Sequence, residues 1–257
     1  EGSSDLLGLR HFIDGMFGYV LEHNVKQMLS ILLDSGGDIK SASDVTEINE
    51  DDLILISYII FTVVEASLFN PLQKSICTQY FTFPSKLTEE IELRRRIKIL
   101  SSRRQQDWDI SPHHVSPAEW SSAVFELSGI ERNPTQSMRL QALVYAAKAI
   151  YSEFKCEVIP LIRASKGDIV SNNDLILGAD DFLPIFIFVV CNAQLKHPQL
   201  NKDMLWKLCH PDQLRGESGY YLTMYESAIE YIMNVEISDE VLHEVNIHES
   251  DIVTQYD

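Results

Sequence analysis

Apolar residues recur at spacings of three and four along most of this chain, and this repeat limits the fold more than any other feature. The stretch 6–33 shows it through Leu9 and Ile13, a spacing typical of an amphipathic helix. The stretch 137–154, "SMRLQALVYAAKAIYSEF", repeats the pattern up to Tyr151. No run of alternating β-branched residues stands between turn signals, as a half-buried strand would require. We therefore expect an all-α fold.

Polar loops separate the predicted helices in the first third of the chain. Residues 34–52 are rich in Gly, Ser and Asp, which predicts an exposed loop. A second apolar stretch, 53–69, is short for a bilayer span and contains Glu65, so we expect a buried helix there. Pro71 is placed to open a further helix.

The next helix is expected from Ser85, a capping residue followed by two glutamates, to about Leu100. The stretch 101–120 holds two prolines and is long enough to mark a seam between subdomains. Within it, Ser116 followed by Pro117 and a glutamate predicts where the next helix begins.

Composition limits the classes of function that the chain can have. Acidic residues outnumber basic ones by 38 to 21, a formal charge of -17, and this field repels nucleic-acid phosphates and anionic lipids over most of the surface. The four cysteines form no CxxC pair, which favours a reducing, intracellular setting. The chain has no secretory signal pattern and begins without Met, so we interpret it as a segment of a longer protein.

Motifs for ordinary catalysis are missing from the sequence. No GxxxxGK[ST], GxGxxG or GxSxG pattern occurs, so the sequence lacks the motifs typical of nucleotide hydrolysis and acyl transfer. His243 and His248 are five residues apart, off the shared face that a zinc helix needs. The basic run 94–104 is interpreted as a solvated helix face, with contact to an acidic partner or anionic lipid as the alternative.

One run places two adjacent carboxylates ahead of an almost wholly apolar segment. It reads "GADDFLPIFIFVV" and contains Asp180, Asp181 and Pro184. With Asp180 as the N-cap, the proline would be the fourth helical residue and would delete the first intrahelical hydrogen bond. With Asp181 as the N-cap, the proline falls among amides that have no intrahelical partner anyway. We therefore predict that Asp181 caps the helix and leaves Asp180 over, with plain double capping as the alternative.

A second stretch, "GESGYYLTMYESAIEYI", divides into two faces. On a helical wheel Leu222 and Tyr225 fall on the core side, while Tyr220 and Thr223 fall on the opposite side. Aromatic residues outside the core are favoured as anchors for a partner. We therefore regard Tyr220 and Thr223 as candidate contact residues, with an ordinary surface tyrosine as the alternative.

These two stretches resemble the VPS-nine domain, the catalytic module of guanine-nucleotide exchange factors for endosomal Rab GTPases. The family pattern is an acidic pair, Phe, Leu and Pro ahead of an apolar helix, then a glycine and an acid before GYY-x-T. Here Asp180 precedes Tyr220 by forty positions, as the pattern requires, and "HPDQLRGESGYYLT" is most similar to the Ras-and-Rab-interactor branch. The resemblance implies an N-terminal helical bundle at 1–84, packed against a layered VPS-nine domain at 85–236, and an acidic tail or helix at 237–257.

The resemblance also implies roles for individual residues. Asp180 would be the acidic finger that enters the Mg²⁺ and phosphate site of the GTPase, and Tyr220 would hold the switch regions open. No cofactor and no metal site are expected in the chain itself, because nucleotide exchange needs no covalent chemistry. The expected GTPase-binding residues are Pro184, Thr223, Leu183 and Asp181.

The implied function is accelerated GDP release from early-endosomal Rab GTPases of the Rab-five subfamily, which regulates endocytic membrane traffic. The implied location is the cytoplasm, with recruitment to early endosomes and peripheral membrane association through flanking regions. Neither nucleic-acid binding nor a transmembrane segment is expected. A non-catalytic, helical Rab-binding adaptor or effector is the alternative function. A hydrolytic site on the loop residues His113 and His114 lacks a nucleophile and base at a meaningful spacing.

Overall fold

The chain folds into helices joined by turns. The computed structural model describes residues 2–34, 50–166 and 175–253, and no strand occurs within these ranges. The all-α fold expected from the periodicity is therefore confirmed. The helices are α1 (Gly2–Asp34), α2 (Glu50–Tyr80), α3 (Pro84–Leu100), η1 (Gln105–Asp107), α4 (Ser121–Arg132), α5 (Gln136–Glu153), the π-helix η2 (Phe154–Val158), α6 (Ile159–Lys166), α7 (Ala179–Asn192), α8 (Pro198–Leu208), α9 (Glu217–Asn234), α10 (Asp239–Glu244) and α11 (Ser250–Val253).

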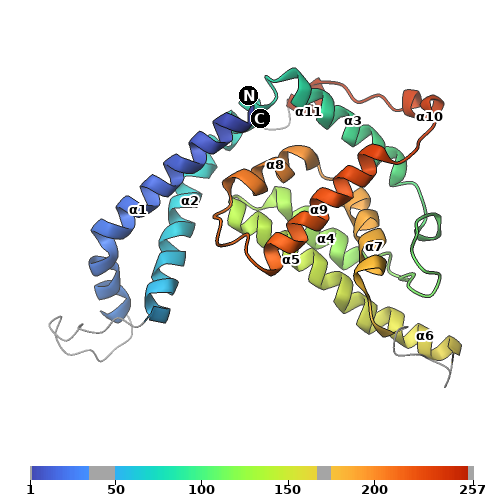
Figure 1. Cartoon of the computed structure of the whole chain (residues 1–257), viewed down its shortest axis with the longest axis horizontal. Coiled ribbons are helices and arrows are strands. Elements are labelled where there is room, and N and C mark those ends of the chain that lie inside the picture. Colours follow the sequence, from blue (N-terminus) through green and yellow to red (C-terminus); the bar gives the residue numbers. More distant parts are fainter. Residues whose placement is uncertain (1, 35–49, 167–174, 254–257) are drawn as a thin grey trace.

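The first two helices form a long antiparallel hairpin beside the remaining helices (Figure 1). Within the hairpin, Phe17 and Phe61 pack edge to face with ring centroids 5.5 Å apart. Helix α1 also packs against α8, where the buried Arg10 donates a hydrogen bond to the Leu208 carbonyl at 2.7 Å. Apolar packing and this buried hydrogen bond therefore anchor the hairpin on α8. The division of the chain into three parts stays a prediction.

The largest hydrophobic core lies where α4, α5, α7 and α9 meet. Phe182, Phe186 and Val189 of α7 are fully buried there, together with Leu143 of α5 and Tyr225 of α9. Burying one large apolar side chain contributes about 1.5–3 kcal/mol. The apolar run that follows the two aspartates is thus a helix buried on most sides, as its sequence indicates.

Two predicted helix starts are wrong because proline takes a different position. Pro71 does not open a helix but lies inside α2, which continues to Tyr80. Phe69 before it and Cys77 after it are buried, and tertiary packing outweighs the one hydrogen bond that the ring removes. Pro84, and not Ser85, opens α3, with the extended residue Phe83 as the N-cap.

Helix α4 begins later than the sequence suggests. Its first residue is Ser121, because Glu119 and Trp120 adopt left-handed backbone conformations with φ of 54° and 58°. Ser116, the predicted cap, hydrogen-bonds in the preceding turn instead. The fully buried Trp120 side chain donates to Gln105 Oε1 at 2.8 Å, and this anchor holds the turn in its unusual conformation.

Glutamates from other helices cap the starts of α4 and α5. Glu153 of α5 accepts the Ser122 amide at 2.6 Å, and Glu65 of α2 accepts the Ser137 amide at 3.0 Å. Both glutamates are buried. Because the first amides of a helix have no intrahelical partner, each glutamate satisfies such a donor and at the same time joins two helices.

The start of α8 is held in the same way by two glutamates. Glu90 of α3 accepts the Leu200 amide at 2.9 Å and the Gln199 amide at 3.3 Å. Glu131 of α4 accepts the His197 amide at 2.7 Å. Burial raises the pKa of the Glu90 carboxyl to about 8, because the interior disfavours its charge more than the two amides stabilise it.

The beginning of the basic run 94–104 holds the C-terminal segment against α3. Its arginines are half-buried, and their guanidinium groups donate to backbone carbonyl oxygens rather than extend freely into solvent. A solvated face therefore describes this part of the run poorly. The bonds run from Arg94 to Asp251 (3.0 Å), from Arg95 to Val245 (3.0 Å) and from Arg96 to Val235 (2.9 Å).

The raised pKa of Glu90 predicts a pH dependence of stability. Between its ordinary value of 4.5 and its folded value of about 8, the folded chain binds more protons at this site than the unfolded chain does. The contribution of Glu90 is therefore fully present below about pH 4.5 and is lost as the pH rises through about 8. The Glu90→Gln side chain stays neutral at every pH. We therefore expect the free energy of unfolding of this variant, measured by urea titration, to increase relative to that of the wild type as the pH rises from 5 to 9. A difference that does not change with pH would contradict this assignment.

Candidate functional site

Helix α7 begins at Ala179, with Gly178 as its N-cap in an extended conformation (φ -75°, ψ 172°). The N-cap is therefore Gly178, which has no side chain to cap the helix, and the prediction that Asp181 is the N-cap is wrong. The first intrahelical bond instead joins the Phe182 amide to the Gly178 carbonyl at 2.9 Å. Both aspartates lie within the first turn, where the helix dipole favours negative charge.

Because α7 begins at Ala179, Pro184 lies inside the helix. An N-cap at Asp181 would have placed this proline in the first turn. Its ring cannot donate a hydrogen bond to the carbonyl four residues earlier, which belongs to Asp180. Asp180 is exposed, so water can reach that carbonyl and replace the missing bond. The proline is therefore tolerated deeper in the helix than a capping rule alone predicts.

The two aspartates differ in what they contact. Asp180 is exposed and makes no hydrogen bond or ion pair with any residue that the structure describes. The Asp181 carboxylate lies 3.4 Å from His114 Nδ1. His114 is itself buried and packs edge to face against Phe154, with ring centroids 5.0 Å apart. Asp181 is thus engaged with the protein, whereas Asp180 is available to a partner.

Aromatic side chains join the first turns of α7 and α9. The Phe182 ring of α7 lies 6.0 Å from the Tyr221 ring of α9, between centroids, and Tyr221 is 5.3 Å from Tyr220. Tyr151 of α5 also stacks on Phe182, with ring centroids 5.2 Å apart and the ring planes 13° apart. We call Tyr151, Tyr220 and Tyr221 the tyrosine cluster. It surrounds Phe182 and brings the ends of three helices together.

The hydroxyl groups of the tyrosine cluster have no hydrogen-bond partner among the described residues. Tyr220 is 43% exposed, but Tyr221 is only 7% exposed. Burial, together with the nearby Tyr151 hydroxyl and Glu217 carboxylate, raises the pKa of Tyr221 to about 12. Tyr151 and Tyr220 are exposed at this surface, so their hydroxyls can bond water in the free chain and a partner in a complex.

The remaining predicted site residues lie on the same two helices. Leu183 and Pro184 are half-buried on α7, and Thr223 is exposed on α9. The Thr223 hydroxyl donates to the Gly219 carbonyl at 3.0 Å, a bond that fixes its orientation on the helix. The structure therefore brings all the predicted residues to adjacent regions of α7 and α9.

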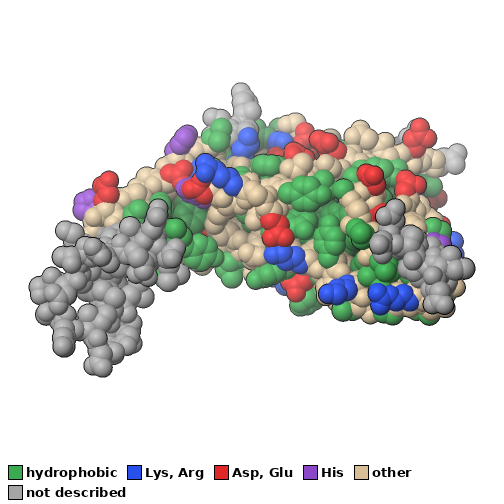
Figure 2. Space-filling view, turned by 60° about the horizontal axis from the view of Figure 1, so that its bottom comes forward, with side chains coloured by type: hydrophobic (Ala, Val, Ile, Leu, Met, Phe, Trp, Pro, Cys, Tyr) green, Lys and Arg blue, Asp and Glu red, His purple; other side chains and the backbone are tan. Residues whose placement is uncertain are grey.

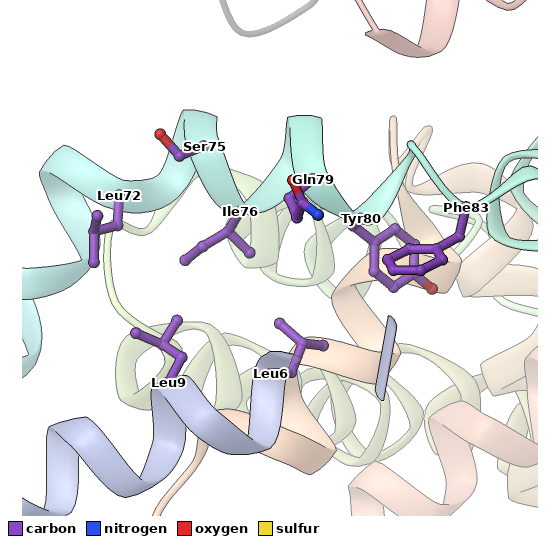
Figure 3. Close-up of a pocket in the computed structure, with 8 residues that line it drawn as sticks. All are labelled: Leu6, Leu9, Leu72, Ser75, Ile76, Gln79, Tyr80 and Phe83. Atoms are coloured by element: carbon purple, nitrogen blue, oxygen red, sulfur yellow. The ribbon is translucent and has the colours of Figure 1, made fainter. Parts of the chain in front are cut away.

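Over the part of the molecule that holds α5, α7 and α9, hydrophobic side chains are exposed among acidic and basic ones (Figure 2). Such a mixed surface is suited to a protein partner. An apolar pocket lies elsewhere, between α1 and α2, where Leu6 and Leu9 face Leu72 and Ile76 (Figure 3). None of the predicted site residues lines it.

The sequence analysis missed two residues that support this site. Tyr151 was assigned to the core stripe of α5, yet it is 37% exposed beside Phe182. His114 was expected in an exposed loop together with His113; only His113 is exposed. Within the ranges that the structure describes, no group of three His, Cys, Asp or Glu residues could hold a metal ion.

Comparison with known proteins decides which family this site belongs to. Residues 120–237 match the Vacuolar sorting protein 9 (VPS9) domain. Residues 120–237 are a VPS9 domain. The match includes α4 to α9 and every predicted site residue, and it confirms the resemblance carried by the two motifs.

Relatives of the chain extend the similarity beyond the VPS9 domain. Protein sprint of Drosophila melanogaster is 24% identical over 232 residues, which are 90% of this chain and 12% of that protein. Vacuolar protein sorting-associated protein 9A of Arabidopsis thaliana is 27% identical over 187 residues, 70% of this chain and 34% of that protein. Ras and Rab interactor 3 of Mus musculus is 23% identical over 214 residues, 82% of this chain and 20% of that protein. The chain thus spans 12% to 34% of the length of these relatives.

Within the described residues, no helix combines the length and the apolar character needed to cross a membrane.

The first turn of α9 depends on two glycines. Gly216, its N-cap, has a φ of 73°, in the left-handed region that favours glycine. A Cβ atom added to Gly219 would lie 1.9 Å from the Leu214 carbonyl oxygen. The backbone before the helix therefore passes closer to residue 219 than any other residue type allows.

We expect Gly219→Ala to lower the free energy of unfolding by about 1–3 kcal/mol, because backbone must move to admit the methyl group. Gly15→Ala is the matched control: this exposed position inside α1 has nothing within 4 Å of an added Cβ. There the same change should be neutral or stabilise by about 0.5–1 kcal/mol. Urea denaturation of both variants measures the difference, and equal effects would contradict the close approach.

Proposed function

We propose that this chain is a guanine-nucleotide exchange factor that accelerates GDP release from Rab GTPases of the Rab-five subfamily. The observation that carries the proposal is Asp180, an exposed carboxylate on the first turn of α7 without a partner among the described residues. The VPS9 domain supports it, and so do the printed names of relatives such as Ras and Rab interactor 3. Tyr220 lies on the neighbouring α9, next to Tyr221, which contacts α7.

In this proposal Asp180 acts by electrostatics alone. A GTPase holds GDP through Mg²⁺ and a lysine on the phosphates. A carboxylate brought into that site attracts the lysine and repels the phosphates. At a separation of about 4 Å and an effective dielectric constant of about 20, each such pair of unit charges interacts by about 4 kcal/mol. That energy corresponds to about a thousandfold change in nucleotide affinity.

Release of the product complex follows from the same coupling. If the exchange factor weakens nucleotide binding by some factor, the nucleotide weakens binding of the exchange factor by that factor. Incoming GTP therefore displaces the chain from the GTPase. No covalent step and no cofactor of the chain is needed.

The neighbouring residues would bind the GTPase rather than its nucleotide. Tyr220 and Thr223 are exposed on α9, where they can contact the switch regions and hold them open. Leu183 and Pro184 offer apolar surface on α7. Asp181, paired with His114, would fix the first turn from which Asp180 extends. We also propose that the chain acts in the cytoplasm and is recruited to early endosomes.

The test is GDP release from a panel of Rab GTPases, followed through a fluorescent GDP analogue. We expect Asp180→Ala to slow catalysed release by about 100-fold or more, as the loss of a preorganised electrostatic group does, without a change in thermal stability. Asp109→Ala is the control, because Asp109 is equally exposed but follows Trp108, which packs against Phe188 and Tyr231 toward the opposite ends of α7 and α9.

Full activity of Asp180→Ala would remove the proposed role of this residue. If the wild type instead binds the GTP form selectively and releases no GDP, the chain is a Rab-binding adaptor or effector. An exchange factor is distinguished by its preference for the nucleotide-free GTPase, which binding to immobilised GTPase in the two states measures directly.

A further inference from the structure

The last turn of α5 contributes a third side to the surface formed by α7 and α9. Tyr151 lies in this turn, and its ring stacks on Phe182 with centroids 5.2 Å apart. The side chain is 37% exposed, so one part of it contacts the protein and another part faces solvent. Nothing in the two family motifs points to this residue, because it lies 29 positions before Asp180 in the sequence.

Contacts on both sides fix the position of Tyr151. The carboxylate of Glu153 accepts the Ser122 amide at 2.6 Å, which ties the end of α5 to α4. On the exposed side, Lys148 Nζ lies 2.9 Å from Glu217 Oε2, and this ion pair joins α5 to the first residue of α9. Tyr151 is therefore held in place before any partner arrives, which lowers the entropy cost of binding.

The hydroxyl of Tyr151 remains unpaired in this fixed position. It makes no hydrogen bond with the described residues. Burial and the neighbouring Tyr220 raise the pKa of this hydroxyl. The deeply buried tyrosine hydroxyls of the chain are bonded internally: Tyr80 donates to Asp203 at 2.6 Å and Tyr225 donates to the Pro198 carbonyl at 3.1 Å. Tyr151 is 37% exposed, and its hydroxyl is left for water or a partner.

We propose that Tyr151 is a further docking residue for the GTPase, acting together with Tyr220. The proposal rests on the proposed exchange function and extends its surface to α5. The exposed part of the ring takes an apolar side chain of the partner, and the hydroxyl donates to a backbone carbonyl or carboxylate beside it. Rigid aromatic residues with a polar end are frequent among the residues that dominate protein interfaces.

This role differs from that of Asp180 in the kinetic constant it affects. Asp180 acts on the nucleotide, so its loss lowers kcat. Tyr151 contacts the body of the GTPase both before and during release, so its loss weakens binding uniformly and raises KM. We expect Tyr151→Ala to raise KM about tenfold and to leave kcat within about twofold, the size of one interface aromatic contact.

Two further variants separate docking from folding. Tyr151→Phe keeps the stack on Phe182 and removes only the hydroxyl, so it should raise KM by about threefold at unchanged thermal stability. Tyr145→Ala is the matched control: it lies on the same helix and is more exposed, at 52%, but has no ring contact with Phe182. Its KM should equal that of the wild type.

The experiment is the GDP-release assay at varied concentration of the chain over a single GTPase, with thermal unfolding of each variant. If the wild type accelerates release, Asp180→Ala loses it, and Tyr151→Ala keeps a wild-type KM, the inference is overturned while the proposed function stands. A rise in KM for Tyr145→Ala equal to that for Tyr151→Ala also overturns it. No acceleration by the wild type on any Rab GTPase overturns the proposed function itself.

Discussion

Buried carboxylates that cap helices from other parts of the chain are the interaction on which this structure depends. Glu65, Glu90 and Glu153 each leave water and accept amides at the start of a different helix. An isolated buried carboxylate is strongly destabilising, and a helix start without partners for its amides is too. Each contact satisfies amides at a helix start and offsets part of the cost of burying the carboxyl group, a cost that still raises the pKa of Glu65 and Glu90. Because the partners are far apart in sequence, capping is complete only when the helices are packed, so local and tertiary structure form together.

Helices α7 and α9 begin differently, and the candidate site lies at these beginnings. Their N-caps, Gly178 and Gly216, carry no side chain, and no side chain of a described residue accepts a hydrogen bond from their first-turn amides. The first turns therefore keep polar groups exposed, with Asp180 on one helix and Tyr220 on the other. A surface that receives another protein must hold such groups in place without using them internally. The stacked rings around Phe182 provide this rigidity, while the carboxylate caps of the other helices stabilise the core beneath.

The sequence was sufficient to predict which segments are helical, because one buried face imposes its period on the residues. It was insufficient to predict how helices begin. Asp181 and Ser85 are residue types that often cap helices. In the structure, however, the helices begin earlier, with Gly178 and Phe83 as the N-caps. The site was predictable where its residues are close together in the sequence, because two short motifs contain Asp180, Tyr220 and the other predicted site residues. Tyr151 and His114 could not be found in this way, since they reach α7 only through the packing of α5 and of the long connection before α4.

In the proposed complex, the first turns of α7 and α9 contact the GTPase directly. Hydrogen–deuterium exchange of the chain, alone and with a nucleotide-free GTPase of the Rab-five subfamily, tests this most directly, because the uncapped first-turn amides exchange readily in the free chain. We expect slower exchange at residues 179–183 and 217–223 in the complex. Slower exchange confined to the α1–α2 hairpin, with these turns unchanged, would contradict it.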